Sequence, residues 1–303
     1  MHIIDGKKIA QQIKEEVKQN VAKLREDGII PVLNIVQVGY NPASTTYVNN
    51  KMKSCREVGI TPFLTRFEEE VTEDEILEFI HRINNYSDGV IVQLPLPKHI
   101  SEEKVIQAIT PEVDVDGFNV VNSGNLMSGL ESTLPCTPAG IIEMLKRSDI
   151  QIAGKHCVII GRSNIVGKPL AILMLKENAT VTIAHSKTEN LKEVCKNADI
   201  LVVAIGKPEF IDSSYVKQGA VVVDVGINRI NGKLVGDVDF ESVKDVASAI
   251  TPVPGGVGPL TVAMLMKNCC DLAKTKNKLR LALEVVGDME LKNNLTKLAF
   301  SFH

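Results

Sequence analysis

The chain has 303 residues, of which 44% are apolar and 23% are charged, and its formal net charge is −3. This composition is too apolar for a disordered protein, and the negative charge argues against a nucleic-acid partner, which would require a basic surface. The length exceeds the usual single-domain size of about 100 to 150 residues, so two domains with separate cores are expected. A small molecule is therefore the favoured partner.

The sequence gives no sign of export, membrane insertion or a structural metal. The first residues reach Asp5 without an apolar run of signal-peptide length, and no apolar run approaches the roughly 18 residues of a membrane span. The six cysteines show no CxxC spacing, and the six histidines are scattered. We expect a cytoplasmic protein with reduced thiols, no metal and no membrane partner.

The first third of the chain alternates between helical and extended patterns. Asn41-Pro42 supplies an N-cap and a proline at the first helical position, which fixes one of the helix starts. Such alternation predicts a mostly parallel sheet covered by helices. In chain order the expected elements are a helix over 7–27, a strand over 32–38, a helix over 42–58, a strand over 62–67, a helix over 72–84 and a strand over 89–94.

The second half repeats this rhythm as a doubly wound, Rossmann-like domain. A helix from Thr137-Pro138 through Leu145 leads into it, and one over 260–273 crosses back. The α/β fold is thus expected to hold an N-terminal catalytic domain, 1–136, completed by 271–303, and a dinucleotide-binding domain, 137–270, with a cleft between them. Its expected strands are 157–160, 181–184, 201–205 and 221–225.

The segment VIIGRSNIVGKPLAILML places Gly161, Arg162, Ser163 and Gly167 between an apolar strand and a helix. This turn allows the backbone to approach a phosphate, and the helix N-terminus favours negative charge. The spacing is GxSxxxG and not GxGxxG, so a tight turn without a ligand is the alternative. The surrounding βαβ rhythm favours a nucleotide site.

The end of the next strand predicts which dinucleotide binds. NAD-preferring sites carry an acidic residue there for the ribose 2′-hydroxyl. Here the strand ends in His185, Ser186 and Lys187, with Arg162 on the neighbouring turn. These groups favour the 2′-phosphate of NADP, although a solvated loop would also explain His185 and Lys187.

Other residues are candidates for the chemistry. Tyr47 and Lys51 lie one helical turn apart, where a lysine can exchange protons with a bound substrate, although a surface lysine packed on a tyrosine is the simpler reading. Gln93 ends a buried strand in DGVIVQLPLP, at the edge where ligands bind in α/β sheets. Asp116 lies in DVDGFN, a sequence also typical of a turn. TPVPGGVGPLT indicates a rigid backbone wall.

Six motifs in unbroken order closely resemble the bifunctional methylenetetrahydrofolate dehydrogenase/methenyltetrahydrofolate cyclohydrolase family, the FolD type. The resemblance covers roughly residues 1 to 275, and it implies oxidation of 5,10-methylenetetrahydrofolate with NADP, then hydrolysis to 10-formyltetrahydrofolate. It also implies a homodimer and a place in one-carbon metabolism and purine biosynthesis. The motifs are VGYNPASTTYVNNKMKSCREVGI, DGVIVQLPLP, DVDGFN, PCTPAGI, GRSNIVGKP and TPVPGGVGPLT.

The resemblance also assigns roles by position. Lys51 matches the family's cyclohydrolase lysine, Tyr47 the tyrosine beside the folate, Gln93 the glutamine that tunes the lysine, and Asp116 the aspartate that anchors the pterin. The residues matching its NADP contacts are Gly161, Arg162, Ser163, Ser186 and Ile227, and those matching its wall beside the folate are Pro254, Gly255 and Gly256.

Two rival functions share the architecture: a dehydrogenase acting on shikimate or an amino acid, and a non-catalytic protein that senses NADP. Neither requires Tyr47, Lys51, Gln93 and Asp116 together. The tail, 277–303, departs from the family in length. Its apolar residues alternate as in a strand from Leu279 to Val285 and later suit a helix, so its structure stays open. We expect it to pack back on the N-terminal domain.

Overall fold

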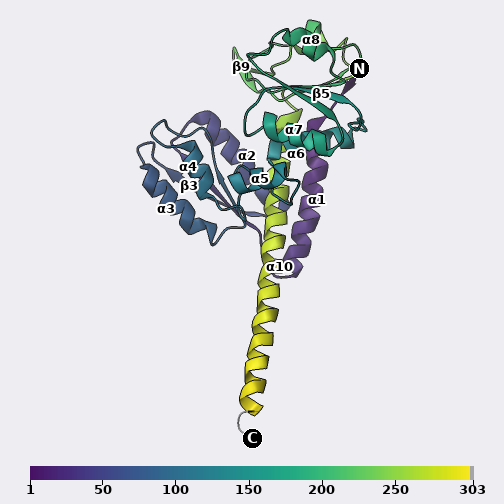
Figure 1. Ribbon diagram of the computed structural model, residues 1–303. Coiled ribbons are helices and arrows are strands. Elements are labelled where there is room, and N and C mark those ends of the chain that lie inside the picture. Colours follow the sequence, from purple (N-terminus) through teal and green to yellow (C-terminus); the bar gives the residue numbers. More distant parts are fainter. Residues whose placement is uncertain (301–303) are drawn as a thin grey trace.

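The computed structural model describes residues 1–300 and shows two α/β units connected by long helices (Figure 1). The elements in chain order are β1 (His2–Ile3), α1 (Gly6–Glu26), β2 (Val32–Val38), α2 (Pro42–Val58), β3 (Thr61–Phe67), α3 (Glu73–Asn84), β4 (Gly89–Val92), α4 (Glu102–Ala108), α5 (Val120–Met127), α6 (Cys136–Arg147), β5 (His156–Ile160), α7 (Gly167–Lys176), β6 (Thr180–Ala184), α8 (Leu191–Lys196), β7 (Ile200–Val203), η1 (Ser213–Tyr215), β8 (Val221–Asp224), β9 (Asn228–Ile230), β10 (Lys233–Val235), α9 (Phe240–Val243), β11 (Ala249–Ile250) and α10 (Val257–Phe300).

The N-terminal unit contains a parallel three-stranded sheet in the order β3-β2-β4. One face packs on α1, α2 and α10 through side chains such as Ile35 and Val48, and the other packs on α3 and α4 through Val36 and Ile80. Each strand therefore has apolar residues on both faces, as expected of a covered parallel sheet. The predicted strands and helices of this unit are confirmed to within one or two residues.

The second unit has a parallel six-stranded sheet in the order β1-β11-β8-β7-β5-β6. Its central strand β7 is apolar and buried throughout, and β5 is so from Cys157 onward, after the partly exposed His156. The four predicted strands are confirmed as β5, β6, β7 and β8. The hairpin β9-β10 and the short strand β11 were not predicted, because segments of two or three residues carry no readable periodicity.

The first strand crosses between the units. His2 and Ile3 pair with Ala249 and Ile250, so β1 forms the edge of the second sheet. These two residues therefore belong to the second sheet, although they come before the first unit in the chain, and the predicted domain boundaries stay predictions. A strand of two residues is stable only because it pairs with a neighbouring strand, here β11, so its own sequence gives no sign of it.

Helix α10 is far longer than the predicted helix over 260–273. It runs from Val257 to Phe300 without a proline after Pro259 to interrupt it, so the strand pattern noted near Leu279 is helical. Figure 1 shows its last turns extending away from both units. Lys276, the residue before the tail, donates a hydrogen bond to Ser87 O of the N-terminal unit. That the tail itself packs on this unit stays a prediction, and its last three residues, 301–303, lie outside the described residues.

Within the described part of the chain, no helix combines the length and apolar character needed to cross a bilayer.

Candidate active site

Helix α2 presents the predicted lysine to the carboxyl end of β4. Its first turn is capped by Asn41, whose Oδ1 accepts a hydrogen bond from Ser44 N at 3.2 Å, as the sequence predicted. Lys51 Nζ donates to Gln93 Oε1 at 3.0 Å. Gln93 is held in turn, because its Nε2 donates to Leu94 O at 2.7 Å and its backbone N–H to Val36 O at 2.8 Å. The predicted contact between lysine and glutamine is present.

The two aspartates of DVDGFN play different parts. Asp114 is buried and accepts hydrogen bonds from Gly117 N, Asn119 N and the side chain of Asn122, so it holds the turn together. Asp116 is half-buried, and burial raises its pKa to about 6 while the positive charge of Lys51 opposes the rise. Asp114 pairs with Val90 of β4, so Asp116, two residues further on, lies toward the carboxyl end of β4 where Gln93 and Lys51 meet.

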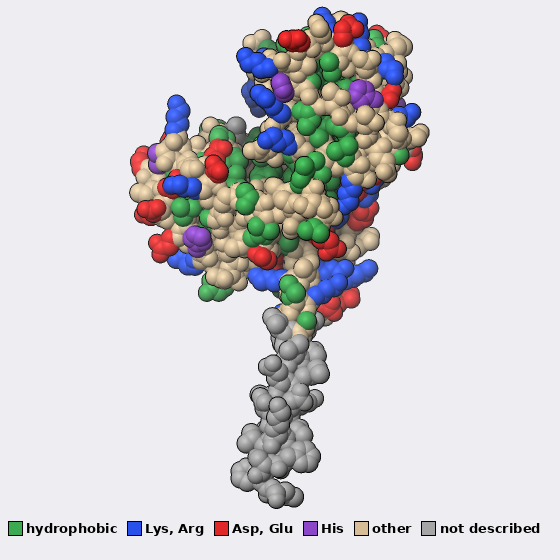
Figure 2. All heavy atoms as spheres, viewed as in Figure 1, with side chains coloured by type: hydrophobic (Ala, Val, Ile, Leu, Met, Phe, Trp, Pro, Cys, Tyr) green, Lys and Arg blue, Asp and Glu red, His purple; other side chains and the backbone are tan. Residues whose placement is uncertain are grey.

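Tyr47 lies one turn before Lys51 on α2 and remains 45% exposed, a large apolar surface beside the lysine. An exposed aromatic ring next to charged groups can pack against the flat ring of a ligand. In Figure 2 a recess separates the two units of the molecule, in keeping with the predicted cleft.

The segment Pro254–Gly256 forms a backbone wall directly before α10. Gly255 has φ of +111° and its carbonyl accepts from Lys7 N at 3.1 Å. A Cβ on Gly256 would lie 2.7 Å from Pro252 O, and one on Gly6 would lie 1.8 Å from Gly256 O. Only glycine permits these approaches, so the wall is fixed against the first turn of α1.

The predicted dinucleotide turn has the geometry of a phosphate cradle. Gly161 has φ of +133°, and a Cβ there would lie 2.3 Å from Ala204 O. A Cβ on Gly167, the first residue of α7, would lie 2.1 Å from Gly161 O. Ser163 Oγ accepts from Val166 N at 3.1 Å and shapes the turn. The two glycines therefore let the turn pack tightly on itself and on Ala204, directly before the N-terminus of α7, where free N–H groups favour an anion.

Arg162 and Ser186 come together through the sheet. Ile160 and Ala184 are register partners on the neighbouring strands β5 and β6, and each is followed two residues later by one of these exposed side chains. His185 and Lys187 form a local turn, in which Lys187 N donates to His185 Nδ1 at 3.2 Å. No acidic residue lies at this strand end, in agreement with the prediction of NADP.

Ile227 follows β8 and is 47% exposed, and its Cδ1 would lie 3.4 Å from a Cβ on Gly258 at the start of α10. The predicted cofactor residue therefore lies next to the start of α10, just beyond the wall.

Two buried aspartates that the sequence interpretation did not single out shape the loops around Ile227. The Asp224 carboxylate accepts from the backbone N–H groups of Gly226, Asp237 and Val238, and burial raises its pKa to about 6. The Asp237 carboxylate accepts from Ile205 N and Gly206 N and from the Asn228 side chain. An aspartate ending the apolar run VVVD was the available signal for Asp224.

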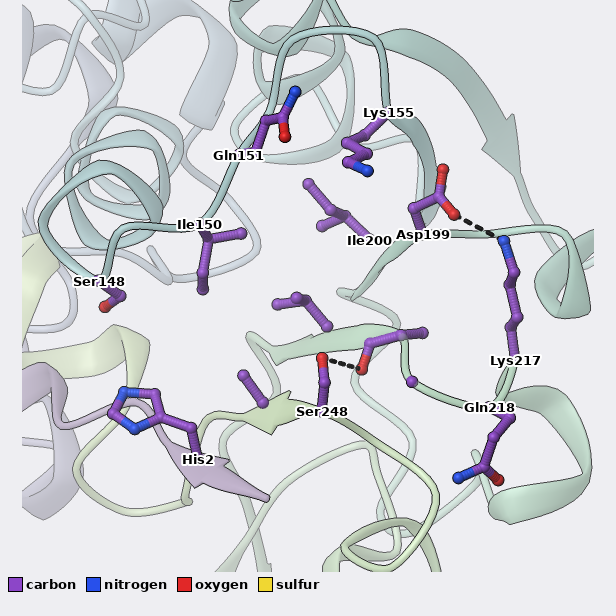
Figure 3. A pocket seen from close by; sticks show the side chains of 14 residues that line it. His2, Ser148, Ile150, Gln151, Lys155, Asp199, Ile200, Lys217, Gln218 and Ser248 are labelled. Carbon is purple, nitrogen blue, oxygen red and sulfur yellow. Dashed lines mark hydrogen bonds and ion pairs between the residues drawn. The ribbon is translucent and has the colours of Figure 1, made fainter.

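A separate cavity of about 580 Å³ opens at the amino-terminal ends of the strands of the second sheet (Figure 3). Its lining includes Lys155 and the ion pair of Lys217 with Asp199 at 2.6 Å. It contains none of the predicted site residues, and it lies at the opposite sheet edge from the turn after β5. It is therefore not the cofactor site.

The fold and these residues define a class: a two-domain α/β enzyme in which a dinucleotide turn accompanies a lysine, a glutamine and an aspartate. Two family models match the chain. Residues 4–116 match the tetrahydrofolate dehydrogenase/cyclohydrolase catalytic domain, and residues 135–277 match the NAD(P)-binding domain of the same family. The chain belongs to the tetrahydrofolate dehydrogenase/cyclohydrolase family.

Individual relatives support this membership. The bifunctional protein FolD of Agathobacter rectalis is 60% identical over 276 residues, covering 90% of this chain and 99% of the relative. The crystal structure of the bifunctional FolD enzyme of Campylobacter jejuni has a TM-score of 0.89 and 46% identity, covering 91% and 99% of the two chains. The FolD structure from Trypanosoma brucei, complexed with NADP and an inhibitor, has a TM-score of 0.85 and 37% identity, covering 90% and 97%.

These comparisons confirm the predicted family, the two-domain α/β fold, the bifunctional enzyme and the use of NADP. The roles of single residues and the exact domain boundaries stay predictions.

Proposed function

We propose that one site in this chain oxidises 5,10-methylenetetrahydrofolate with NADP and hydrolyses the 5,10-methenyl product to 10-formyltetrahydrofolate. The observation that carries the proposal is the convergence of Lys51, Gln93 and Asp116 at the carboxyl edge of the N-terminal sheet. An amine held by an amide and placed near a carboxylate suits a substrate that needs both anchoring and proton transfer.

Asp116 anchors the substrate. The ionised carboxylate accepts hydrogen bonds from the amino and ring N–H groups of the pterin, and such charge-assisted bonds fix both position and orientation. The exposed ring of Tyr47 packs against the folate on the side of α2, and the backbone of Pro254–Gly256 bounds the site on the side of α10. The reacting carbon is thus brought within reach of Lys51.

Lys51 moves the protons of the hydrolytic step. A water molecule attacks the methenyl carbon, and the neutral amine of Lys51 takes the proton that the water releases. The carbon–N5 bond then breaks. The same amine returns its proton to N5, and the hydroxyl of the adduct loses its remaining proton to solvent as it becomes the carbonyl of 10-formyltetrahydrofolate, so one proton is released overall. Gln93 Oε1, at 3.0 Å from Lys51 Nζ, holds the amine in place between these two transfers.

The residues of the second unit fit NADP. When bound, NADP accepts the hydride from the methylene carbon of the substrate. The turn from Gly161 to Gly167 leads directly into the N-terminus of α7, whose free N–H groups suit the diphosphate, while Arg162 and Ser186 offer donors to the 2′-phosphate. The exposed side chain of Ile227, beside the start of α10, would contact the nicotinamide end.

Replacing Ser186 with aspartate is expected to shift the preference from NADP toward NAD. A carboxylate repels the 2′-phosphate and offers an acceptor to a free 2′-hydroxyl. Charge-assisted hydrogen bonds of about 1.5 to 3 kcal/mol correspond to a change of about ten- to a hundredfold in kcat/KM. The measurement is the ratio of kcat/KM for the two cofactors in wild type and variant. Equal efficiency of the wild type with both cofactors would exclude the proposed phosphate contacts.

Removal of residues 277–303 is expected to leave both KM values unchanged and to lower thermal stability slightly. Lys276, retained in this truncation, still donates to Ser87 O at 2.8 Å, and the catalytic residues lie upstream. The loss of thermal stability is expected because the truncation moves the end of α10 closer to the N-terminal unit, and the last turn of a helix frays. Steady-state kinetics and a melting curve test this, and a folded truncation without activity would place the tail in the site.

We further propose that the enzyme acts in the cytoplasm as a homodimer and supplies one-carbon units for purine biosynthesis. The family resemblance supports all three statements.

The decisive assay mixes the protein with 5,10-methylenetetrahydrofolate and NADP and follows NADPH together with the rise and decay of the methenyl species. Formation of both signals supports the proposal. Reduction of NADP by shikimate or an amino acid alone would favour the rival dehydrogenases, and binding of NADP with no turnover of any folate would favour a sensor.

A further inference from the structure

Asn268 on α10 is a buried polar residue to which the mechanism assigns no role. Only 7% of it is exposed. Its Nδ2 group donates to Val115 O at 2.9 Å and to Leu134 O at 2.9 Å. Val115 directly precedes Asp116, and Leu134 comes two residues before Cys136. One amide therefore ties together two distant segments of the chain.

The two segments meet beside the Asp116 carboxyl. Asn268 Nδ2 also approaches Cys136 Sγ at 3.6 Å, and this thiol donates to Val115 O at 3.2 Å. Burial raises the pKa of the Asp116 carboxyl, and the neighbouring Cys136 thiol opposes that rise. Cys136 and Asp116 therefore share one small polar cluster whose frame is fixed by Asn268.

The packing around Gly117 shows how little freedom the cluster has. Gly117 has φ of +69°, and a Cβ there would lie 2.6 Å from Thr133 O and 2.9 Å from Leu134 C. The backbone after Asp116 is thus pressed against the segment that precedes Cys136. A change in the spacing of these segments would move the carboxylate directly.

Helix α10 connects this cluster to the opposite side of the site. The helix begins at Val257, immediately after the wall at Pro254–Gly256, and Thr261 near its start shares a hydrogen bond of 2.8 Å with Thr137. Since a helix is rigid over three turns, the position of the wall and the position of Asp116 are set by the same element.

We propose that Asn268 is a positioning residue for the folate, which fixes the Asp116 carboxylate at a set distance from the backbone wall. Its two amide N–H groups match two backbone carbonyls. Leucine has a similar shape but leaves both carbonyls without this donor, and aspartate would direct oxygen atoms at them. The proposal rests on the proposed function of Asp116 as the pterin anchor.

In the full-length enzyme, Asn268→Leu is expected to raise the folate KM about tenfold or more in both reactions and to leave the NADP KM unchanged, because one displaced anchor affects both reactions. It should also displace the acidic limb of the pH profile of kcat/KM for the folate, which a purely structural role would not move. Asn268→Gln, which keeps the amide, should retain part of the wild-type folate KM.

Met266→Ala provides the matched control, because Met266 is fully buried on the same helix and forms no polar contact with the site. It should lower the melting temperature and leave the folate KM unchanged. If Asn268→Leu behaves in the same way, Asn268 is only structural and the proposal is wrong. If Asn268→Leu does not fold, Asn268→Ser, which keeps one donor, is measured by the same criteria.

Asp116→Asn separates this proposal from the proposed function. If Asp116→Asn leaves the folate KM unchanged, the anchor itself is wrongly assigned. If it raises the KM and Asn268→Leu does not, only the positioning role fails. In the double variant the proposal expects a folate KM no higher than that of Asp116→Asn alone, since Asn268 acts through Asp116, and multiplied effects would contradict it.

Discussion

Replacement of Lys51 with methionine should lower the cyclohydrolase rate by about 10²-fold or more, the usual effect of losing a general acid/base. Methionine keeps a similar length and apolar stem but carries no proton, so the Gln93 contact and both proton transfers are lost. Hydride transfer needs no proton cycle and should fall less. During oxidation of 5,10-methylenetetrahydrofolate the variant should therefore accumulate the methenyl species, which is followed by its absorbance.

Lys53→Met is the matched control for this experiment. Lys53 lies on the same helix, its side chain is 77% exposed, and its partner is Glu57 at 3.9 Å, an exposed pair of little energetic weight. This variant should retain both activities. If it accumulates the methenyl species to the same extent as Lys51→Met, the effect comes from the helix or the surface charge and not from the lysine in the site.

Asp116→Asn should impair both reactions together by weakening the folate anchor. An amide presents an N–H group where the carboxylate accepts, so the folate KM is expected to rise by about ten- to a hundredfold, the weight of one or two charge-assisted hydrogen bonds. The NADP KM should not change. Initial rates at varied folate and fixed NADP test this, and loss of the cyclohydrolase alone would contradict an anchoring role.

The pH dependence of the activity tests the role of the Asp116 carboxyl independently. Burial raises the Asp116 pKa to about 6, so the wild-type carboxylate becomes protonated as the pH falls through that value and stops accepting the pterin N–H groups. The value of kcat/KM for the folate should fall on this limb, and Asp116→Asn should lack it. An unchanged limb in the variant would assign the titration to another group.

The folding stability should change with pH in the opposite direction to the activity. Since the folded-state pKa of Asp116 is raised, this carboxyl contributes stability below its unfolded pKa of about 4, and the contribution is lost as the pH rises through about 6. Asp116→Asn should therefore gain stability relative to the wild type over that interval. The anchor is held in its useful charged form at a cost to the fold, as is common in active sites.

Local sequence patterns predicted those helices and strands whose formation depends on nearby residues. The helical pattern over 7–27 predicted α1, and the cap at Asn41 predicted the start of α2. The family resemblance linked Gln93 with Lys51, and in the structure the two side chains share a hydrogen bond.

Features that depend on distant parts of the chain were not predicted. The edge strand β1 exists only because β11 pairs with it. The side chain of Asn268 donates to Val115 O and Leu134 O, which lie more than a hundred positions earlier in the chain. The Asp237 carboxylate is another case, since its backbone donors come from the loop after β7. A single asparagine or aspartate in the sequence carries no sign of partners that only folding brings near.

The most direct test of the account is the rate at which Lys51→Met hydrolyses 5,10-methenyltetrahydrofolate added without NADP. This assay isolates the proton-transfer step from hydride transfer, and the folate KM of the variant reports whether binding is intact. A rate at least about 10²-fold below that of the wild type at saturating substrate is the predicted result. Hydrolysis at the wild-type rate would show that Lys51 does not transfer the protons and would contradict the mechanism.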